Sequence, residues 1–162
     1  GTPGGALPCG VGAARADASL GQGHRPVARP ARCRLDREFS SAQAMIALSA
    51  MYGANHFPSM RGLACLTEQG TTPTMMSRLS SGLPIFALSR RSDTLQRLAL
   101  CRGVIPLFFD FTAFAPQDLE ARTIEFLVDG GYRSRGDYIL LTMGSCQGES
   151  GKTERMKSVT GE

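Results

Sequence analysis

The residues best suited to chemistry form the segment 67–73, Thr-Glu-Gln-Gly-Thr-Thr-Pro, which lies between an apolar run and a helical pattern. A strand, a glycine-containing turn and a helix together favour phosphate binding, because the first N–H groups of a helix lack internal partners and its dipole is positive there. Gly70 would let the backbone approach a ligand, and Thr67, Thr71 and Thr72 would add hydroxyl donors. The segment therefore predicts a phosphate-binding loop, while a second interpretation stays open, in which Thr71 or Thr72 simply caps the helix.

The elements around this segment alternate between strands and helices. Short apolar runs predict strands, and apolar residues at helical spacing predict helices. The predicted strands are 62–66, 84–88, 104–109, 138–143 and, more weakly, 155–160, and the predicted helices lie between Ser41 and Pro58 and at 73–79, 92–101 and 118–128. This alternation predicts an α/β domain in three layers, an open and mostly parallel sheet with helices on both faces.

Ligands of such sheets bind beyond the carboxyl ends of the parallel strands. Three segments follow predicted strands and should reach this edge, namely residues 67–73, 89–91 and 144–154. The second contains two arginines, Arg90 and Arg91, and the third is rich in glycine and serine. We therefore expect any ligand site to lie where these segments meet.

The third segment contains a sequence that resembles part of a nucleotide-binding Walker A loop, Gly-Glu-Ser-Gly-Lys-Thr at 148–153. The full motif requires a glycine where this chain has Cys146, and it requires a helix after the threonine. Only nine residues follow Thr153 in the sequence. The pattern therefore argues against a nucleotide-hydrolysing loop, although Lys152 is suited to contact a phosphate as a point charge.

The charge of the chain is concentrated at its amino-terminal end. The formal net charge is +4, and residues 1–34, with five arginines and one aspartate, account for all of it. The remaining residues have no net basic charge that would attract a nucleic acid. No apolar run is long enough to cross a membrane. We therefore expect neither nucleic acid nor membrane as a partner.

The five cysteines, at positions 9, 33, 65, 101 and 146, are odd in number and widely spaced. No CxxC pair and no cysteine–histidine cluster of zinc spacing occurs in the sequence. Cys65 and Cys101 lie in apolar patterns, where a free thiol behaves as a small core residue. This usage predicts a reducing compartment, the cytoplasm, and no metal-binding residues.

Two regions of different composition divide the chain. Residues 1–33 are dominated by glycine, alanine, proline and arginine, and we expect this tail to be disordered because it cannot bury enough apolar surface. Residues 34–162 carry the periodic apolar pattern and should form a single α/β domain.

Several segments of this second region resemble the C-terminal domain of pyruvate kinases, particularly of the bacterial type. The matching segments are RLDREF at 34–39, AMIALSAMYGANHF at 44–57, LTEQGTTPTMMSRLSSGLPIFALSR at 66–90, TLQRLALCRGVIPLFFD at 94–110 and GY-x-x-x-GD at 131–137. Their order and spacing follow the family over about four-fifths of the chain. The resemblance implies a regulatory domain with a five-stranded sheet whose last strand is antiparallel and lies near a subunit interface. We therefore expect homo-oligomer contacts through the C-terminal strand.

The resemblance also implies which residues hold the phosphate of an allosteric effector, a sugar phosphate or a nucleotide. The effector phosphate-binding residues would be Thr67, Gln69, Gly70, Thr71 and Thr72, and the effector loop would contribute Gly151, Lys152 and Thr153. Three residues depart from the family pattern, and one of them, Glu154, stands where asparagine is common. Glu68 adds a negative charge beside the phosphate, and Gln69 replaces a small hydroxyl residue.

In this family, phosphoryl transfer between phosphoenolpyruvate and ADP takes place in a separate barrel domain, which carries the Mg²⁺ and K⁺ sites. No segment of this chain resembles that barrel, so we assign no catalytic residue, no metal site and no cofactor and expect the chain alone to be inactive. Two alternatives remain open from the sequence. In the first, the chain is a free-standing α/β module that binds a phosphorylated ligand. In the second, it is a truncated fragment without function.

Overall fold

The computed structural model describes residues 38–79, 81–144 and 153–160, which fold around one mixed β-sheet. The elements in chain order are α1 (Ala42–His56), β1 (Met60–Leu66), α2 (Thr71–Ser77), β2 (Ile85–Ser89), α3 (Ser92–Leu98), β3 (Val104–Phe108), the 3₁₀ helix η1 (Phe111–Ala113), α4 (Leu119–Asp129), β4 (Tyr138–Gly144) and β5 (Thr153–Thr160). Each predicted strand and helix is present, with ends that differ by up to three residues. The short helix η1 was not predicted.

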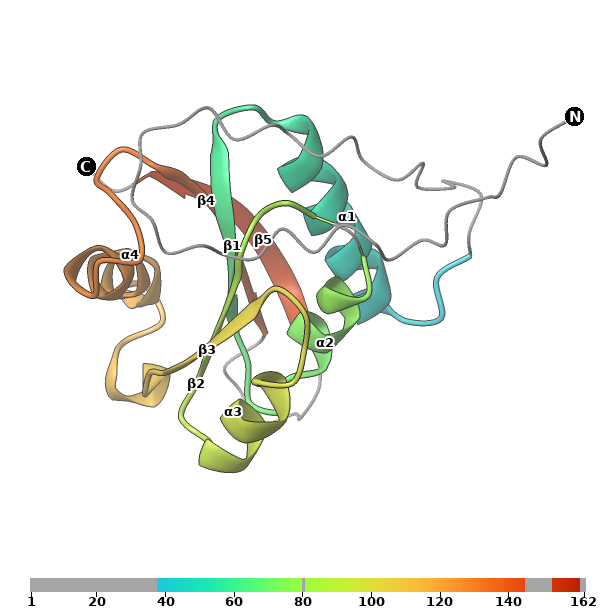
Figure 1. The fold of residues 1–162 in the computed structure, drawn as a ribbon. Helices are drawn as coiled ribbons and strands as arrows, with labels where there is room; N and C mark the ends of the chain where they lie inside the picture. Colours follow the sequence, from blue (N-terminus) through green and yellow to red (C-terminus); the bar gives the residue numbers. More distant parts are fainter. Residues whose placement is uncertain (1–37, 80, 145–152, 161–162) are drawn as a thin grey trace, which may run out of the picture.

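The strand order of the sheet is β3-β2-β1-β4-β5 (Figure 1). The first four strands are parallel, and β5 is antiparallel to β4, which confirms the predicted fold class. The chain moves outward from β1 to β2 and β3, and then crosses back through α4 to place β4 on the other side of β1. This reversal makes the boundary between β1 and β4 the topological switch point of the sheet.

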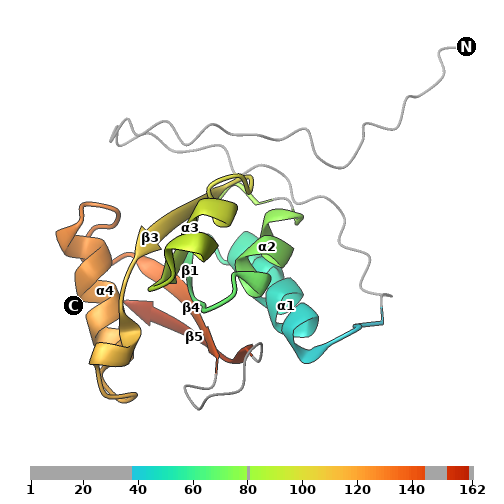
Figure 2. The same ribbon diagram turned by 90° about the horizontal axis from the view of Figure 1, so that it is seen from below.

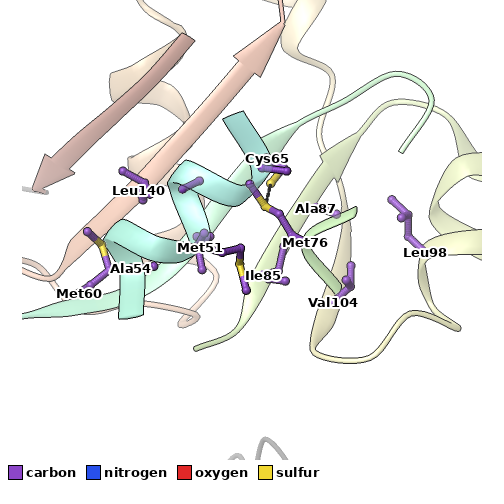
Figure 3. Packing of buried hydrophobic residues seen from close by; sticks show 13 residues of the cluster. Met51, Ala54, Met60, Cys65, Met76, Ile85, Ala87, Leu98, Val104 and Leu140 are labelled. Carbon is purple, nitrogen blue, oxygen red and sulfur yellow. Dashed lines mark hydrogen bonds between the residues drawn. The ribbon is translucent and has the colours of Figure 1, made fainter. Parts of the chain in front are cut away.

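One face of the sheet is covered by α1, α2 and α3 (Figure 2). Its core is built from small and sulfur-containing side chains, among them Met51, Cys65 and Met76 (Figure 3). The Cys65 thiol donates to the Met76 sulfur at 3.4 Å, and both side chains are fully buried. Alanines at 47, 50 and 54 form the buried side of α1 and let this helix lie close to the strands.

The opposite face is covered by α4, and its core contains bulkier side chains, two of them aromatic. Phe86, Phe109 and Leu127 pack there with the leucine and isoleucine side chains of the central strands. Residues 62–66 of β1 and all of β2 are buried on both faces, which explains why residues 62–66 and 85–88 are continuously apolar. The carboxyl ends of these strands are therefore held rigidly from both sides.

Some predictions concern residues outside the described ranges. The amino-terminal tail, 1–33, and most of the segment 144–154, including Gly151 and Lys152, are among them. Within the described part of the chain, no helix is both long and apolar enough to cross a membrane.

Candidate functional site

The candidate site lies at the carboxyl end of β1, at the switch point of the sheet. Leu66 at the end of β1 is paired with Met143 of β4, and Gly144 is paired with Thr153 at the start of β5. The backbone of Thr153 is therefore at the same edge as the loop that begins with Thr67. Chains that leave neighbouring strands toward opposite sides open a crevice, and open α/β sheets bind ligands in this crevice.

The loop between β1 and α2 has a fixed backbone conformation. Its Gly70 has a left-handed backbone, with φ of 78°, and occupies the N-cap position of α2. The N–H of Gly70 donates to Oγ1 of Thr67 at 2.8 Å, and its carbonyl accepts from the hydroxyl of Thr74 at 2.6 Å. Because residues with a side chain rarely adopt this conformation, the glycine determines the shape of the loop.

The glycine also brings the loop close to α3. A Cβ atom at Gly70 would lie 3.1 Å from Cγ2 of Thr94 and 3.2 Å from Leu98, so the close approach is to α3. The close approach of Gly70 to a ligand therefore stays a prediction. The neighbour that the structure identifies is a helix of the same chain.

Two polar side chains of α3 hold this loop. The hydroxyl of Thr94, a fully buried residue, donates to the carbonyl of Glu68 at 2.7 Å. Nη2 of Arg97 lies 3.4 Å from the carbonyl of Gln69 and 3.3 Å from Oγ1 of Thr94. The loop is thus attached to α3 through its backbone, which leaves the side chains of Glu68 and Gln69 directed outward.

The charged residues of this edge form pairs between neighbouring strands. Nε of Arg90, which follows β2, donates to Oε1 of Glu68 at 2.7 Å. This hydrogen bond, followed by the negative charge of Glu68, raises the pKa of Arg90. Asp110, which follows β3, is near enough for the charge of Arg90 to help lower the pKa of its carboxyl, although hydrogen bonds from Thr112 are the larger cause. The negative charge that Glu68 was expected to add is therefore paired.

A second ion pair lies beside the first. Arg91 binds Asp93 through Nε at 3.1 Å and Nη2 at 2.9 Å, and this contact lowers the pKa of Asp93. Both side chains are more than half exposed. In the part of this edge that the structure describes, cations and carboxylates therefore alternate.

The threonines of α2 do not cap this helix, so the alternative interpretation of Thr71 and Thr72 was wrong. The helix begins at Thr71, and its N-cap position is taken by Gly70 without a side-chain hydrogen bond. Thr72 is only 3% exposed, and Thr71 is partly exposed at the start of the helix. Thr71 therefore presents more of its surface at this edge than Thr72 does.

The structure separates the predicted site residues into two groups. Thr67, Gln69, Gly70, Thr71 and Thr72 form one continuous loop and helix start, and Thr153 joins them through its backbone in β5. The chain continues from Thr153 as a strand, which confirms that the Walker-like segment does not lead into a helix. The remaining predicted residues, Gly151 and Lys152, lie outside the described ranges.

Sequence analysis missed Thr94 and Arg97, which support the loop from α3. Their spacing of three residues places both on one side of a helix, but this pattern does not indicate which loop that side faces. Arg90 was noted for its position after a strand, and the structure adds its partner, Glu68.

Two further residues, His56 and Cys65, have structural roles, and the burial of Cys65 confirms its prediction as a core residue. Nδ1 of His56 bonds to the carbonyl of Tyr52 at 2.8 Å within α1. Burial raises the pKa of the Cys65 thiol to about 12, although a hydrogen bond with Thr142 acts in the opposite direction. Among the described residues, no group of histidine, cysteine and carboxylate side chains is arranged to hold a metal ion.

Comparison with known proteins supports the same family as the sequence motifs. A family profile described as "Pyruvate kinase, alpha/beta domain" matches residues 44–159. The pyruvate kinase of Haemophilus influenzae is 41% identical over 143 residues, which are 88% of this chain and 30% of the relative. Pyruvate kinase II of Salmonella typhimurium is 38% identical over 161 residues, which are 99% of this chain and 33% of the relative.

The chain thus spans about a third of the length of these relatives. The five-stranded sheet, its antiparallel last strand and the match over residues 44–159 agree with one another. The chain therefore belongs to the pyruvate kinase family and carries the C-terminal α/β domain of that family.

Proposed function

We propose that this chain is the regulatory domain of a pyruvate kinase and that the loop after β1 binds the phosphoryl group of an effector. The effector is a sugar phosphate or a nucleotide. The observation that carries the proposal is the position of residues 67–72 at the switch point, where the start of β5 joins them. Thr71 supplies a partly exposed hydroxyl, and Arg90 and Arg97 supply cations nearby.

The longer protein that contains this domain would transfer a phosphoryl group between phosphoenolpyruvate and ADP, forming pyruvate and ATP in the cytoplasm. The Mg²⁺ and K⁺ ions of that reaction would be held by another domain. The family membership of the chain supports this activity.

The effector would act by shifting a conformational equilibrium. A ligand that binds one arrangement of the domains more tightly than another increases the population of that arrangement, and the coupling is reciprocal. The contacts between the loop and α3 give such a ligand a route to a second element, because movement of Glu68 or Gln69 disturbs Thr94 and Arg97.

The proposal is tested by thermal unfolding of the chain with millimolar sugar phosphates and AMP. A ligand at 100 times its dissociation constant should stabilise the folded state by about 2.7 kcal/mol. The variant Thr71→Asp should lose this stabilisation through like-charge repulsion. Thr160→Asp adds the same charge at the opposite end of the sheet and should behave as the wild type. If no phosphate ester raises the unfolding temperature of the wild-type chain, the proposed effector site is refuted.

We further propose that two copies associate through β5. This strand is at the edge of the sheet and is paired on one side, with β4, within the described residues. An unpaired strand edge is a template for a second strand. Ser158→Pro removes one backbone donor from β5 and should lower the dimer fraction measured by sedimentation. A monomeric wild-type chain at high concentration would exclude this mode of association.

A further inference from the structure

Glu68 is held in two different ways. Its backbone carbonyl accepts a hydrogen bond from the buried hydroxyl of Thr94, so α3 fixes its position. Its carboxylate pairs with Arg90 at the surface, where the two side chains are 35% and 48% exposed, respectively. Exposed pairs of this kind contribute little to stability and exchange partners readily. The structure therefore anchors the backbone of Glu68 to α3 and leaves its ion pair at the surface.

Arg90 lies between two carboxylates at this edge. Glu68 follows β1 on one side, and Asp110 follows β3 on the other. Nε of Arg90 is already used by Glu68. An anion that binds Arg90 at this edge can therefore use Nε only if Glu68 releases it.

A phosphoryl group and a carboxylate require the same geometry from arginine. The planar guanidinium offers parallel N–H donors that match either group. A phosphate ester, however, carries between −1.5 and −2 charges at neutral pH and three acceptor oxygens. It can therefore displace a carboxylate that a singly charged ligand would leave in place.

We propose that Glu68 is an internal competitor for Arg90 and that a phosphate monoester binds at this edge by taking Arg90 from Glu68. This inference rests on the proposed effector site and adds its regulation. The ion pair lowers the affinity of the site for phosphate, because a two-pronged phosphate contact through Nε and Nη of Arg90 requires Nε to leave Glu68. It also favours doubly charged phosphate esters over carboxylate ligands.

The experiment compares four forms of the full chain: the wild type, Glu68→Gln, Arg90→Gln and the double variant. Calorimetric titration with glucose 6-phosphate and with inorganic phosphate gives the dissociation constants. Glu68→Gln should bind phosphate about three- to tenfold more tightly, since it removes the competing charge. Adding Arg90→Gln to that variant should weaken binding by about tenfold, because the freed cation is then lost.

Glu125→Gln is the matched control. It removes the carboxylate of another exposed ion pair, Arg122–Glu125, which has a comparable length of 2.8 Å and lies in α4 on the other face of the sheet. Its phosphate affinity should equal that of the wild type, as should its far-ultraviolet circular dichroism. This control separates the loss of any surface ion pair from the release of Arg90.

The outcomes distinguish this inference from the function on which it rests. Tighter binding in Glu68→Gln that depends on Arg90 supports both, even where the wild type binds too weakly to measure. Equal affinity in the wild type and Glu68→Gln overturns the competitor and leaves the effector site intact. Tighter binding that persists in the double variant also overturns it, since charge repulsion alone would then explain the effect. If none of the four forms binds phosphate, both proposals fail.

Discussion

The two ends of the sheet use arginine in opposite ways. At the carboxyl end, Arg90 pairs with Glu68 in an exposed contact. At the amino end, the guanidinium of Arg133 lies 4.8 Å from the ring centroid of Phe86 and is partly buried. The Tyr132 ring packs against the same phenylalanine at 5.9 Å. One arginine thus forms an ion pair at the surface, and the other is part of the packing.

Glycines at the two ends reflect this difference. Gly62 at the amino end leaves space for the cation and the ring, because a Cβ there would lie 2.9 Å from Nη2 of Arg133 and 3.1 Å from Phe86. Gly70 at the carboxyl end shapes a loop whose Glu68 side chain forms an ion pair at the surface. We infer that the amino end contributes stability and the carboxyl end contributes ligand binding, and the following variants test this division.

The largest effect should come from Phe86→Ala at the amino end. Phe86 is 2% exposed, and its truncation should lower the free energy of unfolding by about 3–5 kcal/mol through the cavity that it leaves. Urea unfolding measures this loss, and Phe86→Leu should recover much of it. Phosphate affinity of the folded fraction should be unchanged. A specific loss of affinity in both variants would show that the two ends are not independent.

The second largest effect should come from Gly70→Ala, which should lower the free energy of unfolding by about 2–4 kcal/mol. The substitution combines an unfavourable backbone angle with contacts to Thr94 and Leu98 at 3.1–3.2 Å. Gly103→Ala is the control, since Gly103 has a similar φ of 71° and no neighbour within 4 Å of a new Cβ. Its loss should be smaller, about 1–2 kcal/mol. Equal losses in the two variants would mean that contact with α3 does not constrain the loop.

The third effect tests how far the apolar core extends toward the carboxyl end. Cys65 precedes the last residue of β1, and burial raises its pKa from 9.0 to about 12. Above pH 9 the unfolded thiol loses its proton while the folded one keeps it, so stability is full below pH 9 and falls as the pH rises toward 12. Between pH 7 and 10, the free energy of unfolding of the wild type should fall by about 1.4 kcal/mol more than that of Cys65→Ala. If the free energy of unfolding depended on pH in the same way for both proteins, the Cys65 thiol would not be buried as described.

The last variant should combine a modest loss of stability with weaker phosphate binding. Thr94→Val removes the hydroxyl that holds Glu68 and should cost about 1–2 kcal/mol. Thr123→Val is a close match, because Thr123 is equally buried and donates to the carbonyl of Leu119 at 2.7 Å within α4. Both variants should unfold at similar urea concentrations, but Thr94→Val should bind phosphate more weakly. Equal phosphate affinities in the two variants would show that the contact between Thr94 and Glu68 does not influence binding at the loop.

Much of the fold could be predicted from local sequence patterns. Apolar runs such as 85–88 and 139–141 are continuous because both faces of the sheet are covered. They were therefore correctly predicted to be strands. Element ends were less predictable. The α2 helix begins at Thr71 instead of Pro73 because Gly70 takes the N-cap position. Threonine and glycine are about equally preferred at this position, so the sequence does not indicate which of them caps the helix.

The sequence by itself determined the α/β class, the position of the loop after β1 and, through its motifs, the family. These properties depend on periodicity and on residues close together in the chain. Only the tertiary structure decided that Thr94 supports Glu68 and that Arg90 pairs with it, because these contacts join residues 26 and 22 positions apart. The strand order that makes β1 and β2 neighbours brings such residues together, and this order is set by packing across the whole sheet.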